Sequence, residues 1–207
     1  MVRYVMVIDL RRCVGCDTCT VACRVENFTP KGILWCKVEK IEIGKYPNAN
    51  LLPIPMHCMH CANPPCVKIC PTGASYKRED GIVLIDYDKC MGCRACVVAC
   101  PYNQRYYVEE IKEYYNGKGF TPYEEIRETL EGAKKHKKGI TEKCTFCVDR
   151  VDKGEKPFCV ETCIADAIFF GDLDDPQSEA ARLIASRGGF QLRRELGTDP
   201  SVYYLPP

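Results

Sequence analysis

Sixteen of the seventeen cysteines fall into four quartets, and only Cys36 stands outside them. Each quartet ends in a Cys-x3-Cys step. Three thiolates close together in sequence can surround three corners of one metal cluster, whereas a fourth placed three residues further on points away from it. The spacing therefore predicts that neighbouring clusters exchange their fourth ligand. The quartets are Cys13, Cys16, Cys19, Cys23; Cys58, Cys61, Cys66, Cys70; Cys90, Cys93, Cys96, Cys100; and Cys144, Cys147, Cys159, Cys163.

Zinc is the main alternative to iron, because four cysteines hold Zn²⁺ tetrahedrally and Cys-x2-Cys pairs are common in such sites. Zinc sites usually take two cysteines from each of two loops. The runs CVGCDTCTVAC and CMGCRACVVACP instead have the C-x2-C-x2-C-x3-C spacing of bacterial ferredoxins, and the second includes the following Pro101. Cysteines this close together cannot all reach disulfide partners. We predict four [4Fe-4S] clusters, with a multi-zinc structural adaptor as the alternative.

The formal net charge of +1 counts every thiol as neutral. Four clusters with four thiolates each would add about −2 apiece, which brings the loaded chain to roughly −7. The basic residues then serve partly as counter-charge, and we expect no nucleic-acid partner. No apolar run approaches the roughly 18 residues that cross a bilayer, and the first residues lack a secretory signal. We expect no direct membrane span, so any membrane attachment or export depends on a partner.

A repeat sets the elements that hold these cysteines. Val7, Ile8 and Asp9 precede Cys13 at the same distance at which Leu84, Ile85 and Asp86 precede Cys90, and Gly15 matches Gly92. The offset between the copies is 77 residues, from position 13 to position 90. Each copy predicts a short strand, a cysteine loop and a helical turn.

The spacing of the quartets predicts how they pair. Residues 71–89 are enough for one compact two-cluster module from the second and third quartets, which leaves the first and fourth to pair around it. Pairing the first with the second and the third with the fourth is the alternative, and it requires long segments inside each module. We predict an α+β fold of two ferredoxin-like 2[4Fe-4S] modules, one inserted in the other. Its parts are an outer module, 1–57 plus 141–175; an inner module, 58–104; a helical insertion, 105–140; and an extended C-terminal tail, 176–207.

The insertion carries the signature of a helix start. Thr121 as N-cap, Pro122 at the first helical position and Glu124 form a capping box. Four residues then fall on one helical face: Tyr123, Ile126, Leu130 and Ala133. This face predicts either packing on the modules or a docking surface for another subunit.

The tail predicts one helix over 178–186 and an extended end over 202–207. That end either packs on this chain or forms an arm across a partner. Among residues outside the quartets, Cys36 is expected in a buried strand, His57 and His60 in structural or hydrogen-bonding roles, and His136 in solvent. No catalytic motif such as GxSxG, a P-loop or HExxH accompanies the cysteines, so the chain is expected to pass electrons without substrate chemistry.

With these residues in place, the chain resembles the four-cluster iron-sulfur subunit of the dimethyl sulfoxide reductase family of molybdenum or tungsten oxidoreductases. It is most similar to the polysulfide, thiosulfate or tetrathionate reductase type. One departure is Cys163-Ile164-Ala165-Asp166, where the family often has Cys-Pro-Thr-Gly-Ala. The resemblance rests on the motifs CVGCDTCTVAC, CMHCANPPCVKICPTGA, GIVLIDYDKCMGCRACVVACPYN, KCTFCVDRV, FGDLDDP and ELGTDPSVYYL.

The resemblance implies four ligand sets, which we call groups 1 to 4. Group 1 is Cys13, Cys16, Cys19 and Cys163; group 2 is Cys23, Cys144, Cys147 and Cys159; group 3 is Cys58, Cys61, Cys66 and Cys100; group 4 is Cys70, Cys90, Cys93 and Cys96.

The resemblance also implies two partners: a molybdopterin- or tungstopterin-containing catalytic subunit near group 1, and an integral membrane subunit that handles quinone near group 4. The complex is expected at the membrane, on the extracytoplasmic face through co-export with the catalytic subunit, with the cytoplasmic face left open. The small subunit of a non-redox pterin transhydroxylase is a further alternative.

Overall fold

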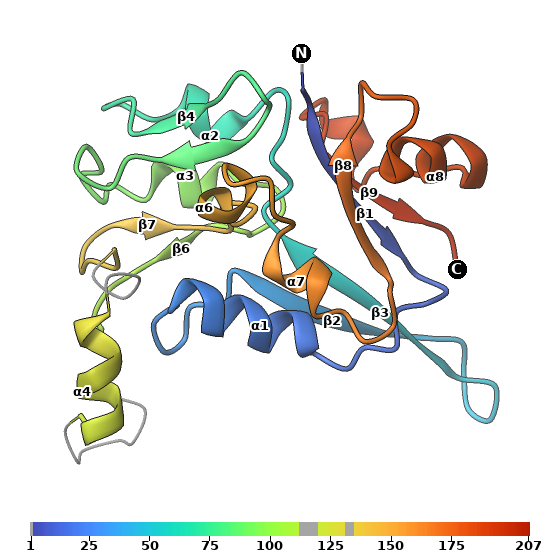
Figure 1. Ribbon diagram of the computed structural model, residues 1–207, viewed down its shortest axis with the longest axis horizontal. Helices are drawn as coiled ribbons and strands as arrows, with labels where there is room; N and C mark the ends of the chain where they lie inside the picture. The colour runs from blue at the N-terminus through green and yellow to red at the C-terminus, as the bar shows by residue number, and fades with distance from the viewer. Residues whose placement is uncertain (1, 112–119, 131–134) are drawn as a thin grey trace.

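The computed structural model describes residues 2–111, 120–130 and 135–207. Its largest sheet has the strand order β8-β1-β9, with β1 (Tyr4–Asp9) in the centre. The strand β8 (Ile168–Asp172) runs antiparallel to β1, and β9 (Val202–Leu205) runs parallel to it. The N-terminal strand is therefore held between two segments from the far end of the chain (Figure 1).

The central strand is buried on both faces. Val5 and Val7 on one face pack with Ala180 of helix α8 (Glu179–Arg187) and with Leu205. Met6 and Ile8 on the other face join the main core, which contains most of the buried cysteines. Gly171 on β8 allows α8 to approach, because a Cβ atom there would lie 2.4 Å from the Ser178 hydroxyl oxygen.

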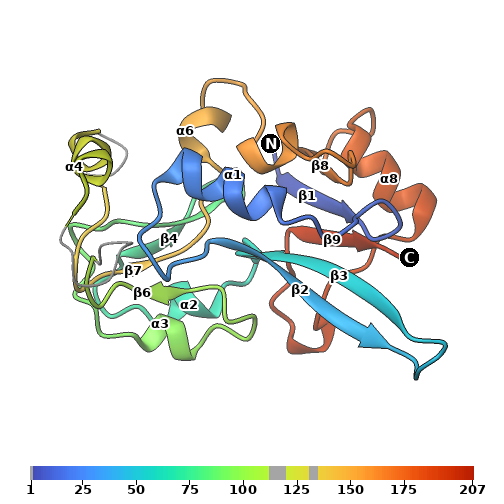
Figure 2. The same ribbon diagram turned by 90° about the horizontal axis from the view of Figure 1, so that it is seen from below.

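A long hairpin crosses the molecule next to this sheet. Its strands β2 (Cys36–Ile43) and β3 (Asn50–His57) pair from Cys36 opposite His57 outward to Ile43 opposite Asn50. The far half of the hairpin projects from the body of the protein (Figures 1 and 2). Helix α1 (Thr18–Asn27) packs on β2 and on helix α7 (Phe158–Glu161). The first quartet on α1 is thereby brought beside the fourth quartet on α7.

The second and third quartets lie on two short units. Helix α2 (Pro65–Lys68) packs on α3 (Ala95–Val98), and strand β4 (Ser75–Lys77) pairs with β5 (Val83–Ile85). Helix α6 (Val148–Val151) carries the loop of the fourth quartet. The repeat is confirmed at the level of local structure, since β1 and β5 each lead into a cysteine loop and then a helix.

The insertion closes at its base through β6 (Tyr106–Tyr107) and β7 (Thr141–Glu142), which pair antiparallel. Helix α4 (Pro122–Thr129) begins at the predicted capping box. The Thr121 N–H and hydroxyl each donate to the Glu124 carboxylate at 2.7 Å, and the Glu124 N–H donates back to Thr121 Oγ1 at 3.3 Å. Ile126 and Leu130 are exposed. Ala133 and the side chain of Tyr123 lie outside the described residues.

The tail belongs to the body of the protein. Helix α8 confirms the predicted helix within one residue, and a short 3₁₀ helix, η1 (Arg194–Leu196), follows it. The extended end is β9, and its Val202, Tyr204 and Leu205 are fully buried. The end therefore packs on this chain, and the arm across a partner is wrong. No helix among the described residues is long and apolar enough to cross a bilayer.

Candidate functional site

Group 1 is assembled from two ends of the chain. Cys13, Cys16 and Cys19 surround a loop in which Gly15 has a φ of +67°, and Cys163 faces them from the loop that leads to β8. These four cysteines line one cavity of about 320 Å³, open solvent included, together with Val38 and Pro55 of the hairpin. The hairpin therefore forms one wall of group 1.

Group 4 repeats this arrangement 77 residues later. Cys90, Cys93 and Cys96 surround the loop at Gly92, where φ is +70°, and Cys70 completes a cavity of about 320 Å³. A Cβ atom at position 92 would lie 2.0 Å from the Gly139 carbonyl oxygen, so this loop requires glycine. The Ser75 N–H donates to Cys70 Sγ at 3.4 Å, which favours the thiolate needed for iron ligation.

Group 3 lines a cavity of about 330 Å³ formed by Cys58, Cys61, Cys66 and Cys100, with Arg105 in its wall. Burial raises the pKa of the Cys61 thiol to about 12, an effect to which the neighbouring Cys58 adds. Such thiols are protonated at neutral pH in the metal-free chain. Metal binding must therefore displace their protons.

Group 2 has three buried cysteines and the partly buried Cys159. Asn27 lies beside two of its members, with Nδ2 3.6 Å from Cys23 Sγ and 3.7 Å from Cys147 Sγ. Burial, with the nearby Cys147, Cys144 and Cys23 sulfurs, raises the pKa of the Cys159 thiol far above its usual value. Sequence reasoning missed Asn27, since a lone asparagine at a helix end gives no distinctive signal.

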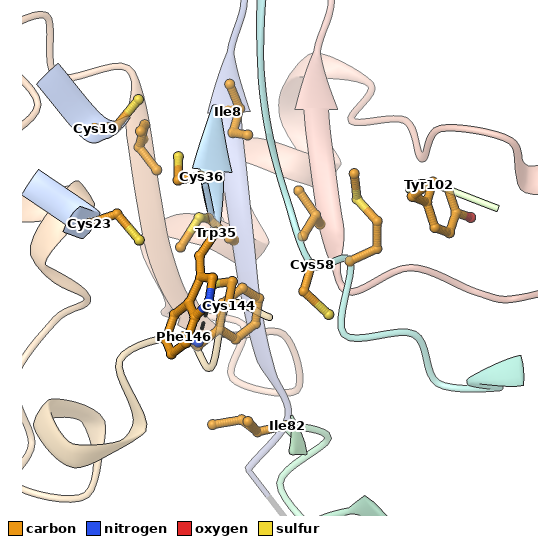
Figure 3. Packing of buried hydrophobic residues seen from close by; sticks show 14 of the residues in the cluster. Ile8, Cys19, Cys23, Trp35, Cys36, Cys58, Ile82, Tyr102, Cys144 and Phe146 are labelled. Atoms are coloured by element: carbon orange, nitrogen blue, oxygen red, sulfur yellow. Dashed lines mark hydrogen bonds between the residues drawn. The ribbon is translucent and has the colours of Figure 1, made fainter. Parts of the chain in front are cut away.

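The four groups follow one another through the core. Buried Cys19, Cys23, Cys36, Cys58, Cys61 and Cys144 share one hydrophobic cluster with Ile8, Trp35 and Phe146 (Figure 3). A second cluster joins Cys66 of group 3 to Cys96 of group 4 through Val83. The structure thus brings the first quartet to the fourth and the second to the third. That iron joins these particular sets stays a prediction.

Comparison with known proteins identifies the family. Residues 49–119 and 117–173 match the family described as "4Fe-4S dicluster domain". The chain is 47% identical to the B subunit of selenate reductase from Mesobacillus selenatarsenatis, over 99% of this chain and 72% of that protein. It is 40% identical to the B subunit of tetrathionate reductase from Salmonella typhimurium, over 98% of this chain and 72% of that protein. The chain belongs to this family.

A third relative extends the range of chemistry. The chain is 39% identical to the B subunit of sulfite dehydrogenase from Allochromatium vinosum, over 100% of this chain and 84% of that protein. The protein is thus an iron-sulfur subunit of the dimethyl sulfoxide reductase family, and its role is electron transfer within an oxidoreductase complex rather than catalysis. These matches favour [4Fe-4S] clusters over the zinc alternative.

The shape of the site also fits a cluster of several atoms. A zinc ion would draw four sulfurs to about 2.3 Å from a single point. The cysteines of groups 1, 3 and 4 instead surround cavities.

Arg105 supplies a second test of fit. Its side chain is buried, and its Nη2 has no hydrogen-bond partner among the described residues. A buried guanidinium N–H without a partner is costly. Because Arg105 also lines the group 3 cavity, the sulfur atoms of an iron-sulfur cluster there would provide its missing acceptor.

The residues outside the quartets behave in three ways. Cys36 is the first residue of β2 and is buried, as predicted. His57 and His60 are buried, and His60 Nδ1 accepts the Val83 N–H at 3.0 Å while the ring stacks on Phe146. These structural roles are confirmed.

The prediction for His136 is wrong. Its ring is buried, with Nδ1 2.8 Å from Glu142 Oε1 and Nε2 2.7 Å from the Asn27 carbonyl oxygen. Its position among lysines in the sequence suggested a solvated helix, but helix α4 ends at Thr129 and His136 turns inward against α1. The buried cations Arg105 and Lys143 were also missed, although basic residues in general were expected to offset the cluster charge.

Proposed function

We propose that the chain carries four [4Fe-4S] clusters, one in each of groups 1 to 4, and relays single electrons along them. The observation that supports this most is the exchange of fourth cysteines. Cys100 lies with Cys58, Cys61 and Cys66, although its sequence neighbours Cys90, Cys93 and Cys96 line another cavity with Cys70. This exchange is the arrangement of two-cluster ferredoxins.

We further propose that groups 1 and 2 belong to an outer module, 1–57 plus 141–175, and groups 3 and 4 to an inner module, 58–104, with 105–140 as an insertion. The pairing of β6 with β7 supports an insertion, because it brings the two ends of 105–140 together. The strand β9 gives the outer module an additional strand from the tail.

The two ends of the relay are inferred from exposure. Cys16 of group 1 and Cys93 of group 4 are exposed, whereas groups 2 and 3 have three buried cysteines each and no exposed one. We infer that a pterin-bearing catalytic subunit docks near group 1 and a quinone-interacting membrane subunit near group 4. The relatives named for selenate and tetrathionate reductases support a reductase complex, which we propose is held at the membrane through its partners, on the extracytoplasmic face.

The ligand exchange is tested on the full chain purified without oxygen. We expect about 16 irons per chain, four for each cluster, and four paramagnetic centres on reduction. Cys58→Ser and Cys100→Ser should alter the same electron paramagnetic resonance signal, whereas Cys90→Ser should alter a different one. If Cys100→Ser and Cys90→Ser altered the same signal, the ligand sets would be wrong. Reduction of the clusters by a quinol in the purified complex tests the proposed partner.

A further inference from the structure

Two buried cations lie beside the inner groups, groups 3 and 4. Arg105 is 4% exposed and Lys143 is 1% exposed. Each stands next to one strand of the β6–β7 pair, so the closed base of the insertion brings them to the same region. Among the described residues, neither forms an ion pair with a carboxylate. Arg and Lys are rarely this buried without an anionic partner.

Arg105 faces the sulfurs of both inner groups. Its Nη1 donates to the Ser75 hydroxyl at 2.8 Å, which fixes the orientation of the guanidinium. Its Nη2 has no hydrogen-bond partner among the described residues. Burial acts to lower the pKa of this guanidinium, but the neighbouring Cys66, Cys58 and Cys96 sulfurs outweigh it and raise the pKa above its usual value. Cys58 and Cys66 belong to group 3, and Cys96 belongs to group 4.

Lys143 approaches the same junction through the backbone. Its ammonium donates to the Val83 carbonyl and, at 2.8 Å, to the Cys144 carbonyl. Val83 is the residue on which Cys66 and Cys96 pack together. Lys143 therefore stands between group 2 and the inner groups, because Cys144 belongs to group 2, whereas Arg105 faces the inner groups alone.

The junction between groups 1 and 2 differs. Cys36 lies there beside Cys19 of group 1 and near Cys159 and Cys23 of group 2. Cys36 is 4% exposed and packs with Cys19 and Cys23 in the main core, so a thiol side chain and no cation fills this position. The side chain that donates to the group 2 sulfurs is the neutral amide of Asn27, and the charged side chains near Cys147, Arg150 and Glu26, form an ion pair with each other.

We propose that Arg105 is a positioning residue of the electron relay that holds the two inner clusters at higher reduction potentials than the outer pair. This inference rests on the proposed four-cluster arrangement. When an electron passes from the group 2 cluster to the group 3 cluster, the group 2 cluster is oxidised. The group 3 cluster is reduced and gains one negative charge. A fixed cation in a low-dielectric interior stabilises that added charge. No proton moves, because the guanidinium stays charged throughout.

The test compares midpoint potentials of the full chain purified without oxygen and titrated by electron paramagnetic resonance. In Arg105→Gln, we expect the equilibrium constant for reduction to fall at least tenfold for the two inner clusters, about 59 mV for a one-electron couple. For the clusters of groups 1 and 2, the equilibrium constant for reduction should change by less than about twofold. Arg105→Lys, which keeps the charge, should recover most of the potential. Cys70→Ser marks the group 4 signal.

The matched control is Arg94→Gln. Arg94 lines the group 4 cavity but is exposed, with its guanidinium 3.7 Å over the Tyr107 ring. Solvent screens the charge of Arg94, so we expect Arg94→Gln to change the equilibrium constant for reduction of each cluster by less than about twofold. If Arg105→Gln kept four clusters with unchanged potentials, or shifted all four equally, the inference would be overturned. If Arg105→Gln lost its iron, Ser75→Ala, which removes the hydroxyl that holds the guanidinium, would decide by whether it shifts the inner potentials and not the outer ones. Fewer than four clusters in the unsubstituted chain would refute the proposed function instead.

Discussion

Asp9 and Asp86 occupy the same place in the two copies of the repeat, at the turn that leads into each cysteine loop. Asp9 Oδ1 accepts the Arg11 N–H at 3.0 Å, and Asp86 Oδ1 accepts the Asp88 N–H at 3.0 Å. Asp9 is buried and is bound by the guanidinium of Arg187 on α8. Asp86 is partly exposed and, among the described residues, forms an ion pair only with Lys89. The same turn is anchored by the tail in the first copy and by local contacts in the second.

The apolar contacts of the two copies also differ, and again the tail supports only the first copy. In the first copy, Val5 and Val7 of the strand pack with Ala180 and Leu205 in a cluster without cysteine. In the second copy, Val83 packs with Cys66 and Cys96, which are both predicted cluster ligands, while Leu84, like Ile8 of the first copy, joins the main core. One face of the first strand is therefore held by polypeptide contacts alone, whereas no such cysteine-free cluster supports the second strand among the described residues. The predictions below test that difference.

Removal of iron should give the largest effect. Oxidation and chelation remove the bonds that replace apolar packing, and folding is coupled to metal binding in such sites. We expect backbone amides of β4, β5 and α3 to lose nearly all protection from hydrogen exchange. Amides of β1 and β8 should keep a measurable part of theirs. Hydrogen exchange with mass spectrometry on the loaded and stripped chain measures both. Equal loss of protection in β1 and β5 would show that the two copies depend on iron alike.

Substitution of the two aspartates should give the next largest effect. Asp9→Asn leaves the buried Arg187 contact without its charge partner, and we expect the free energy of unfolding of the loaded chain to fall by about 1–3 kcal/mol. Asp86→Asn should change it little, because water replaces the exposed contact. Anaerobic chemical denaturation followed by circular dichroism provides the comparison. A larger loss in Asp86→Asn would contradict it.

The pH dependence of this difference has a defined sign. Burial acts to raise the pKa of Asp9, but hydrogen bonds from Arg187 and from the Arg11 backbone hold it below its usual value. A carboxylate with a depressed native pKa contributes stability that is present above its unfolded pKa and is lost as the pH falls through the native one. The gap between the unsubstituted chain and Asp9→Asn should therefore stay constant from about pH 5 to pH 8.

Sequence spacing was enough to predict the local elements of the site. The strands, cysteine loops, capping box and tail helix depend on short-range rules, such as the left-handed glycine in each loop and the reciprocal bonds of Thr121 and Glu124. The environment of His136, Arg105 and Lys143 depends on the approach of segments far apart in the chain. No periodicity marks such residues, because each is defined by a partner more than 25 residues away, such as Asn27 for His136 or Ser75 for Arg105.

Another pair of equivalent residues in the two copies, Asn27 and Gln104, gives the smallest and most specific prediction. Asn27 and Gln104 are related by the 77-residue offset, yet only Asn27 directs its side-chain amide to cluster ligands, Cys23 and Cys147. The Gln104 amide donates to the Tyr102 carbonyl and accepts the Tyr106 hydroxyl. Hydrogen bonds to sulfur raise the reduction potential of a cluster. Asn27→Leu should therefore lower the potential of group 2 by about 30–60 mV, the equivalent of roughly one hydrogen bond.

Gln104→Met is the matched control, because its lost hydrogen bonds affect packing and not the ligands. We expect it to lower the midpoint of chemical denaturation while all four potentials stay within about 15 mV of the original, since a change of about twofold in the reduction equilibrium corresponds to that range. Asn27→Leu would thus change the potential of a cluster in the first copy, whereas Gln104→Met would change only the stability of the second copy. A potential shift in Gln104→Met as large as that in Asn27→Leu would mean that the amide contacts to Cys23 and Cys147 have no specific electronic role.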